Sequence, residues 1–402
     1  MSDDQEIPSQ EPPPRLEPLV PDPGGIIDPA NLVDREATLA LLLESIPSGG
    51  SYLVGDRRMG KTSLLRKAEA ELRDAGHLVI RTSAELADLA TFSAQLLQSI
   101  RNEARLRRPL ENFEKELSGE ASVMVFGNGL KLGGKLKRTG KHTEADLMSL
   151  CAQALRTAGP HRLVIIIDEI AVLANRLAIR DPQAGSDFLH SLRLARQTLD
   201  NVSTVLAGSV GLHHAVADLT SLNDLREIQV GALSHADATL LARRLLLWVY
   251  QYDDDASAAL AGDIAGECGN IPYYIHRFVD DWRQGNGPMP TSKQVEFAVN
   301  EALLTNCWGT DHYFNRMASY YGPDRELAIE VLDLLVQRKS LPVDDLTLEL
   351  GAAHLDAPPG RERVGELLRK LSKDHYTTVT GTHYTMASPW MARVWHAIRT
   401  MR

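Results

Sequence analysis

The chain has few of the features that mark secreted, membrane-spanning or zinc-binding proteins. It contains three cysteines, Cys151, Cys268 and Cys307, at widely separated positions in 402 residues, which argues against a disulfide framework and against a zinc site. Its apolar runs fall short of the ~20 residues that a transmembrane helix needs. The amino-terminal segment lacks a basic start followed by an apolar run, the mark of a secretory signal. We therefore expect a cytoplasmic protein that does not insert into membranes.

The chain also has fewer basic than acidic residues. Lys and Arg number 43 against 53 Asp and Glu, so the formal net charge is −10 at pH 7. This balance argues against wholesale coating of nucleic acid, although it leaves room for a local basic patch. The hydrophobic content of 44% and the charged content of 24% are ordinary for a globular protein. A chain of this length holds two or three domains.

A complete phosphate-binding loop follows a short apolar strand. The loop matches the pattern G-x-x-x-x-G-K-[ST], with a predicted strand at 51–54 before it and a predicted helix at 64–72 after it. In that setting backbone N–H groups surround the phosphates of ATP, Lys61 bridges the outer phosphates and the Thr62 hydroxyl binds Mg²⁺. The predicted nucleotide-binding residues of the loop are Gly55, Asp56, Arg57, Arg58, Met59, Gly60, Lys61, Thr62 and Ser63.

Two acidic residues follow the most apolar strand of the sequence. Residues 163–167 read Leu-Val-Ile-Ile-Ile, which predicts a strand buried on both faces, and Asp168 and Glu169 come directly after it. Parallel sheets bind their ligands at this carboxyl end. We predict that Asp168 holds Mg²⁺, directly or through water, and that Glu169 activates the attacking water as a general base.

Further strands alternate with helical patterns. A helix is predicted over 85–107, where apolar residues recur at helical spacing. The further predicted strands are 78–82, 162–168, 202–207 and 227–230. This alternation predicts an α/β core over residues 31–231, a P-loop NTPase parallel sheet that helices cover on both faces.

The order of these motifs resembles the additional-strand class of P-loop NTPases, which includes AAA+ and STAND ATPases. Strand 78–82 lies in the sequence between the P-loop strand and the acidic strand. In that class an extra strand separates those two in the sheet and leaves room for a catalytic Glu and a water. The resemblance implies that Ser209 is a γ-phosphate sensor, with a plain strand-end turn as the alternative. It also implies that Arg226 is an arginine finger for a neighbouring subunit, with an ordinary arginine as the alternative.

Two further segments resemble nucleotide-contacting elements of STAND and archaeal-type AAA+ ATPases. Residues 269–272, Gly-Asn-Ile-Pro, resemble the G-x-P element of their lid, with one extra residue before the proline. Residues 34–36, Asp-Arg-Glu, resemble their G-R-E box, with Asp in place of Gly. The resemblance implies that Val33, Arg35 and Pro272 contact the base and ribose of the nucleotide.

The last part of the chain, residues 323–402, changes pattern. Three helical stretches precede two short β-stretches around a Gly turn, which is the order of a winged helix. A domain of this kind ends many archaeal-type ATPases, and the resemblance makes residues 232–322 a helical lid subdomain. Residues 361–386 are mildly basic, which would allow DNA contact through phosphates. The acidic chain as a whole favours the alternative, an autoinhibitory or protein-docking winged helix.

Two segments fall outside this plan. Residues 1–30 are rich in proline and acids, which predicts a disordered tail, with a polyproline ligand for a partner as the alternative. Residues 120–141 predict a hairpin insertion that carries several basic side chains. This insertion is either a solvated rim of the domain or a contact surface for a partner or nucleic acid.

Two pairs of basic side chains carry no predicted contact. We expect His213 and His214 at the surface rather than on a metal ion, because the sequence places no cysteine or third histidine near them. We also expect the side chains of Arg57 and Arg58 to face solvent.

These residues together predict an ATP-binding and ATP-hydrolysing molecular switch of the STAND or AAA+ type. Its cofactors are ATP and Mg²⁺, and its nucleotide state is expected to control self-association or the binding of a protein partner. One alternative is an ATP-controlled DNA-binding regulator or loader that acts through the winged helix. Another is a nucleotide-bound scaffold with little turnover, recruited through the proline-rich tail. The predicted catalytic residues are Glu169, Lys61, Ser209 and Arg226.

Overall fold

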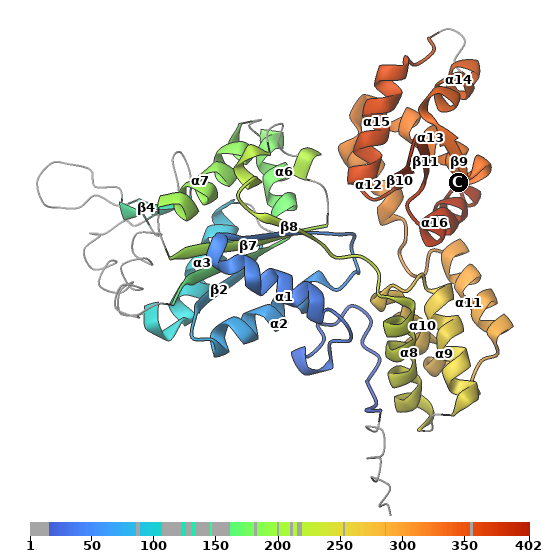
Figure 1. Ribbon diagram of the computed structural model, residues 1–402, viewed down its shortest axis with the longest axis horizontal. Coiled ribbons are helices and arrows are strands. Elements are labelled where there is room, and N and C mark those ends of the chain that lie inside the picture. Colours follow the sequence, from blue (N-terminus) through green and yellow to red (C-terminus); the bar gives the residue numbers. More distant parts are fainter. Residues whose placement is uncertain are drawn as a thin grey trace, which may run out of the picture.

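The chain folds around a parallel sheet, which is followed by a helical lid and a carboxyl-terminal winged helix (Figure 1). Within the part of this computed structural model that is described, no helix is long and apolar enough to cross a bilayer. The described residues are 16–85, 89–106, 122–125, 130–133, 145–146, 161–180, 183–198, 201–209, 212–214, 219–251, 254–285, 287–353 and 357–402.

The central sheet has five strands in the order β2-β6-β7-β1-β8. Every neighbouring pair in it runs parallel, so the predicted parallel sheet is confirmed. Its strands are β1 (Gly50–Val54), β2 (Leu78–Ser83), β6 (Leu163–Asp168), β7 (Val202–Gly208) and β8 (Arg226–Gln229).

A strand does separate the P-loop strand from the acidic strand, as the resemblance implies, but it is not the strand at 78–82. β7 separates the P-loop strand β1 from the acidic strand β6, whereas β2, the strand predicted at 78–82, lies at the outer side of the sheet beside β6. Order along the chain does not determine order across a sheet, because a helical crossover can pass over several strands. The carboxyl ends of parallel strands meet at one end of the sheet. The observed order therefore places Ser209, directly after β7, between the P-loop and Asp168.

Helices cover both faces of this sheet because its central strands are apolar on both sides. α1 and α2 pack on one face, and α3, α6 and α7 pack on the other. Along β6, Val164 and Ile166 belong to the first core, while Ile165 and Ile167 belong to the second, as the alternation of side chains along a strand requires. The helices are α1 (Glu36–Ser45), α2 (Lys61–Asp74), α3 (Leu89–Asn102), α6 (Ile170–Arg180) and α7 (Ala184–Thr198).

The predicted hairpin within 120–141 is present as an antiparallel pair. β3 (Ser122–Val125) pairs with β4 (Leu130–Gly133), and a short strand, β5 (Ala145–Asp146), joins β4 on its other side. The turn and most of the basic residues of this insertion lie outside the described residues.

Four helices form the lid. The Ser234 side chain accepts a hydrogen bond from Asp237 N at 3.1 Å and caps α8, and Asp254 caps α9 in a reciprocal capping box. Pro272 occupies the first turn of α10, where no N–H is needed. The lid helices are α8 (His235–Tyr250), α9 (Asp255–Glu267), α10 (Pro272–Gln284) and α11 (Ser292–Leu304).

The carboxyl-terminal region has the helix–strand–helix–helix–hairpin order of a winged helix. The predicted third helix and wing are present, and the short strand β9, which the sequence did not predict, pairs antiparallel with β11. A further helix, α12 (His312–Tyr320), connects this region to the lid. The elements are α13 (Arg325–Arg338), β9 (Ser340–Pro342), α14 (Val343–Ala353), α15 (Arg361–Lys373), β10 (Thr377–Thr380), β11 (His383–Met386) and α16 (Pro389–Thr400).

Part of the segment predicted as a disordered tail packs on the lid. Leu19 is buried, and its N–H donates to the Arg244 carbonyl at 2.9 Å. The Asp22 N–H donates to His276 Nδ1 at 3.1 Å. Residues 16–30 therefore have ordered contacts, because their few apolar side chains find an apolar groove that the sequence does not reveal. Residues 1–15 lie outside the described part of the chain.

The lid and the winged helix pack together through aromatic side chains. The Trp390 ring of α16 lies 4.8 Å from the Tyr274 ring of α10, measured between centroids. Trp390 also covers Gly269, where a Cβ would lie 2.6 Å from Trp390 Cγ. Arg393 adds an ion pair to Glu267 at 2.6 Å. Because these contacts are apolar and extensive, the lid and the winged helix form one unit.

Candidate nucleotide-binding site

The loop between β1 and α2 has the backbone of a phosphate cradle. Arg58 and Gly60 have positive φ values of +74° and +86°, and α2 begins at Lys61. Gly55 has no room for a side chain, because a Cβ there would lie 2.2 Å from the Val230 carbonyl oxygen. The N–H groups of the first turn of a helix lack helical partners and attract anions. The cradle therefore fits a phosphate group.

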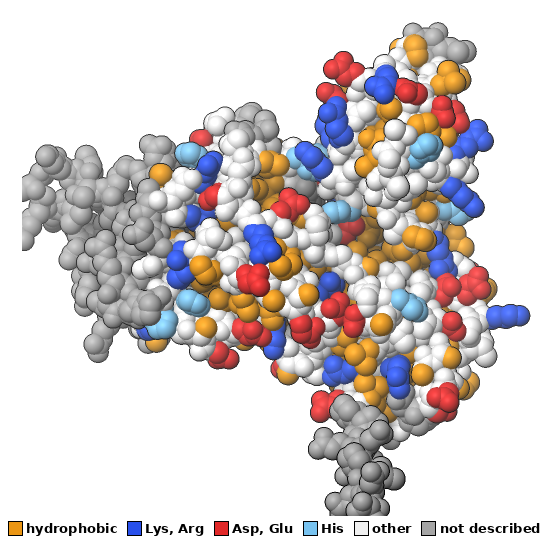
Figure 2. All heavy atoms as spheres, viewed as in Figure 1, with side chains coloured by type: hydrophobic (Ala, Val, Ile, Leu, Met, Phe, Trp, Pro, Cys, Tyr) orange, Lys and Arg blue, Asp and Glu red, His pale blue; other side chains and the backbone are white. Residues whose placement is uncertain are grey.

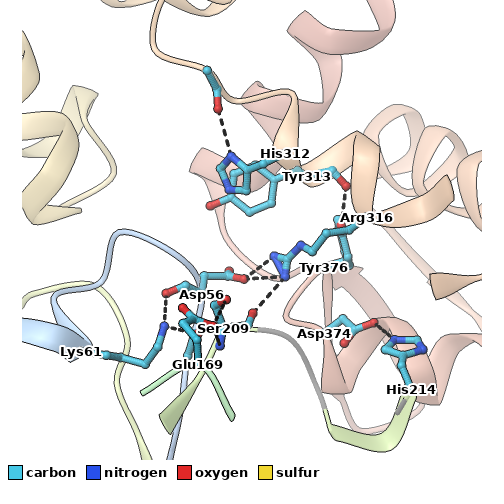
Figure 3. A network of polar contacts seen from close by, with 12 residues as sticks. Asp56, Lys61, Glu169, Ser209, His214, His312, Tyr313, Arg316, Asp374 and Tyr376 are labelled. Carbon is cyan, nitrogen blue, oxygen red and sulfur yellow. Dashed lines mark hydrogen bonds and ion pairs between the residues drawn. The ribbon is translucent and has the colours of Figure 1, made fainter. Parts of the chain in front are cut away.

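Lys61 is buried at the centre of this cradle (Figure 3). Its Nζ donates to the carbonyl oxygens of Gly55 at 2.7 Å and Asp56 at 2.8 Å. Burial lowers the pKa of Lys61, and the neighbouring carboxylates, Glu169 foremost, oppose that change. Phosphate oxygens would be stronger partners for the ammonium than these neutral carbonyls.

Thr62 and Asp168 meet beside the cradle, as their predicted roles require. Thr62 Oγ1 donates to Asp168 Oδ2 at 2.7 Å. Burial raises the pKa of Asp168, whereas the hydrogen bond from Thr62 lowers it. Because the Thr62 proton points at the carboxylate, the hydroxyl lone pairs remain for a cation. Oxygen atoms of this kind are the ligands that Mg²⁺ prefers, and the metal roles of Thr62 and Asp168 stay predictions.

Glu169 and Ser209 are bonded to each other. Glu169 Oε2 accepts hydrogen bonds from Ser209 N at 3.2 Å and from Ser209 Oγ at 2.8 Å. Glu169 has a φ of +54°, which is unusual for a residue with a side chain and directs it toward the end of β7. The predicted base and the predicted sensor therefore occupy one place at the end of the sheet (Figure 3).

A cavity beside the loop is lined by the residues predicted to contact the base and ribose. Arg35 connects the P-loop to the segment after β8, because its Nη2 donates to the carbonyl oxygens of Met59 at 3.0 Å and Gly231 at 2.7 Å. Asp34, which replaces the glycine of the G-R-E pattern, has a φ of +55°, a conformation that Asp tolerates better than most residues. The predicted residues that line the cavity are Val33, Arg35, Met59, Gly60, Ser63 and Pro272.

Arg316 of α12 reaches the cradle from the carboxyl-terminal half of the chain. Its Nη2 donates to Asp56 Oδ1 at 2.7 Å, and its Nη1 donates to the Ser209 carbonyl at 3.3 Å. The guanidinium lies 5.4 Å from the ring centroids of both Tyr313 and Tyr376. Burial raises the pKa of the Asp56 carboxyl and the Arg316 charge opposes it. Arg316 belongs to no motif, so the sequence analysis did not find it.

Comparison with known proteins agrees with this geometry. A family model described as an AAA domain matches residues 48–216, which contain the cradle, the acidic strand and β7. The part of the chain that matches this model, residues 48–216, is called the AAA domain below. With the sheet order and the winged helix, the chain has the fold of an archaeal-type AAA+ P-loop ATPase. No curated protein matches the chain by sequence.

Two solved structures resemble nearly the whole chain. The Walker-type ATPase of Pyrococcus abyssi superposes with a TM-score of 0.61 at 18% identity, over 91% of this chain and 97% of that one. The Aeropyrum pernix ORC2 protein, solved as ADPNP–ADP complexes, superposes with a TM-score of 0.51 at 12% identity, over 91% and 92%. At these identities the likeness concerns the fold.

The two arginines of the loop differ from the expectation that both face solvent. Arg57 is exposed and pairs with Glu85 at 2.8 Å. Arg58 instead connects the AAA domain to the lid: its Nη1 donates to Tyr274 Oη at 2.9 Å and to the Trp308 carbonyl at 2.6 Å. Its guanidinium stacks 4.1 Å from the Tyr273 ring centroid. The aromatic residues at the start of α10 attract it by a cation–π interaction.

Arg226 does not take part in the nucleotide site of its own chain. It is the first residue of β8 and pairs with Ser51, near the start of β1, at the opposite end of the sheet from the cradle. Its side chain is 45% exposed and lies 3.2 Å from Glu44. Only a neighbouring subunit could present its cradle to Arg226, so the finger role remains a prediction.

Three basic side chains of α15, Arg361, Arg363 and Lys370, lie within ion-pair distance of acids. Arg363 lies 2.8 Å from Asp324, and Arg361 pairs with Asp344. Figure 2 shows positive and negative side chains interspersed over the lobe that contains this helix. This mixed surface offers little net attraction to a phosphate backbone.

Proposed function

We propose that this chain is an ATP-hydrolysing switch in which the bound nucleotide decides whether the lid and winged helix stay closed on the AAA domain. The contact of Arg316 with Asp56 and the Ser209 carbonyl carries the proposal. It places a cation from a distant helix beside the phosphate cradle. A positive charge in that place would be attracted more strongly by a bound triphosphate than by a bound diphosphate.

The residues of the cradle have separate tasks in this proposal. The base and ribose would occupy the cavity lined by Val33, Arg35 and Pro272. Lys61 would exchange its two carbonyl partners for phosphate oxygens. Thr62 and Asp168 would hold Mg²⁺, which supplies charge neutralisation to the phosphates.

Glu169 would accept a proton from the attacking water. Its Oε2 is held by Ser209 in the present arrangement, so the base becomes available when the Ser209 hydroxyl turns to the γ-phosphate. This exchange would make hydrolysis depend on a correctly bound triphosphate. It gives Ser209 the sensor role and Glu169 the role of general base.

Arg316 would couple this chemistry to the rest of the molecule. A γ-phosphate carries more charge than the Asp56 carboxylate and would compete for the guanidinium. ADP lacks that phosphate and would leave the Arg316–Asp56 pair intact. The lid and winged helix would then differ in position between the two states, which would expose or cover a surface for self-association or for a partner.

The first test is ATP binding and turnover by wild type, Lys61→Ala and Glu169→Gln, with Arg338→Ala in α13 as an exposed-arginine control. We expect Lys61→Ala to lose ATP binding. We expect Glu169→Gln to bind ATP and to turn it over at least about 100-fold more slowly. Equal turnover by wild type and Glu169→Gln would remove Glu169 from its role. A wild-type chain that binds no ATP would refute the whole proposal.

The second test is particle size with ADP and with a non-hydrolysable ATP analogue. We expect the wild-type chain to change its hydrodynamic radius or its oligomeric state between the two nucleotides. Arg316→Ala should give the same size with both, because its signal to the winged helix is lost. A wild-type size that is identical with both nucleotides would favour the alternative of a nucleotide-bound scaffold.

A further inference from the structure

A cluster of histidine and carboxylate side chains joins the AAA domain to the winged helix. His213 and His214 lie in the short helix η3 (Leu212–His214), shortly after Ser209, and Asp374 follows the last residue of α15. His214 Nε2 lies 2.5 Å from Asp374 Oδ2, and His213 Nε2 lies 3.5 Å from Asp374 Oδ1. Figure 3 shows Asp374 and His214 directed at each other, to one side of the cradle. The expectation that both histidines are surface residues is therefore wrong.

The cluster is largely buried and incompletely bonded. The side chains of His213, His214 and Asp374 are 13%, 6% and 4% exposed. Within the described part of the chain, His213 Nε2 and Asp374 Oδ1 are buried atoms without a hydrogen-bond partner. Leaving such atoms unpaired costs about 1–3 kcal/mol each. A nitrogen and a carboxylate oxygen that face each other at 3.5 Å could both bind one cation.

The donor set identifies the class of cation. Two imidazole nitrogens and one carboxylate oxygen suit Zn²⁺ and similar transition-metal ions, whereas Mg²⁺ and Ca²⁺ take oxygen ligands. One ligand atom from each of the three residues lies within 4.8 Å of the others. A tetrahedral zinc site needs about 3.3 Å between ligand atoms. Side-chain shifts of about 1 Å would therefore suffice.

Asp374 Oδ2 has two partners outside the proposed bond to His213. One is His214 Nε2, which gives up this hydrogen bond when it binds a metal ion. The Tyr321 hydroxyl donates to Asp374 Oδ2 at 2.7 Å. It thereby orients the carboxylate with Oδ1 toward His213, as outer partners of metal ligands do.

We propose that His213 Nε2, His214 Nε2 and Asp374 Oδ1 bind a divalent transition-metal ion of the zinc class, with a fourth position left for water. The ion joins the segment after the sensor strand to the start of the wing. Asp374 lies beside Tyr376, whose ring faces Arg316. The ion therefore clamps the winged helix in the position in which Arg316 contacts Asp56. The clamp's effect on ATP turnover rests on the proposed function, whereas the metal site does not.

The experiment measures metal binding by the full chain after chelator treatment. Zn²⁺ affinity is determined by competition with a chromophoric chelator, and Co²⁺ absorption reports the ligand set. We expect about one ion per chain for wild type, with the visible bands of four-coordinate Co²⁺. His213→Ala and Asp374→Asn should lose at least about 100-fold in affinity, and Tyr321→Phe about 10-fold or more. His396→Ala removes an exposed histidine of α16 and should bind as wild type does.

Two further measurements separate the outcomes. Zn²⁺ should raise the thermal midpoint of wild type and His396→Ala but not of Asp374→Asn. Lys61→Ala should bind Zn²⁺ like wild type even though it loses ATP, so failure of the switch and failure of the metal site are distinguishable. Absence of Zn²⁺ and Co²⁺ binding by wild type, or unchanged affinity in His213→Ala and Asp374→Asn, would overturn the proposal and leave a plain His214–Asp374 hydrogen bond.

Discussion

Arg316 and Asp56 form a buried ion pair between positions 260 residues apart, with Nη2 and Oδ1 separated by 2.7 Å. The pair joins the phosphate cradle to α12, which connects the lid to the winged helix. Two side chains of this kind can separate by a change of rotamer. The ion pair is therefore suited to open and close without unfolding either part.

Removal of one partner should destabilise the closed arrangement more than removal of both. Arg316→Ala leaves the Asp56 carboxylate buried without its cation, which costs about 3–5 kcal/mol. The double variant Asp56→Asn, Arg316→Ala also removes the carboxylate charge. It should therefore recover part of the stability that Arg316→Ala loses. Amide hydrogen exchange in α12, measured without nucleotide for wild type, both single variants and the double variant, gives the coupling. Additive single effects would show that the pair contributes no specific stability.

Ser209→Ala should slow ATP turnover while it preserves ATP binding. The substitution removes the hydroxyl that bonds Glu169 Oε2 at 2.8 Å, together with the proposed sensing of the γ-phosphate. We expect turnover to fall by about 10–100-fold, less than for Glu169→Gln, because the base itself remains. Single-turnover kinetics and nucleotide affinity separate the two effects, and Ser203→Ala in β7, the strand before Ser209, is the matched control. Weaker ATP binding without slower chemistry would contradict the sensor role.

Stability should decrease as the pH falls below about 6.5 because of His276. Burial lowers the pKa of His276 to about 4 in the folded protein, below the value of about 6.5 in an unfolded chain. The unfolded state therefore takes up a proton first. The contribution is fully present above pH 6.5 and is lost as the pH falls toward 4. The loss is about 2 kcal/mol between pH 7.5 and pH 5.

Urea denaturation at the two pH values checks this effect. His276→Asn keeps an acceptor for the Asp22 N–H but cannot titrate, so its stability should fall less between the two pH values than that of wild type. His396→Asn alters an exposed histidine and should follow wild type. Equal pH dependence of wild type and His276→Asn would exclude His276 as the source.

Gly269→Ala should separate the lid from the winged helix. Gly269 has a φ of +64°, and the added Cβ would lie 2.6 Å from Trp390 Cγ. The positive φ costs about 1 kcal/mol for alanine and the clash costs about 1–3 kcal/mol more. Thermal unfolding should show a lower midpoint. Gly365→Ala is the control, because its Cβ would meet no atom within 4 Å and should stabilise α15.

The sequence by itself predicted the nucleotide-site residues and most of the local structure. The P-loop, the pair Asp168 and Glu169, the strands of the sheet and the wing around Gly381 are contiguous patterns. Their glycines, apolar runs and caps carry the physical signal within a few residues. The cavity residues Val33, Arg35 and Pro272 could be named because each belongs to a short motif.

Only the tertiary structure decided which distant residues meet. It placed β7 rather than β2 beside β1, brought Arg316 to Asp56, joined His214 to Asp374 and docked Asp22 on His276. The last three contacts connect residues 260, 160 and 254 positions apart. Such contacts depend on how whole elements pack and leave no periodicity in the sequence. For the same physical reason, Arg226 lies at the far end of the sheet and Arg316 lies at the phosphate cradle.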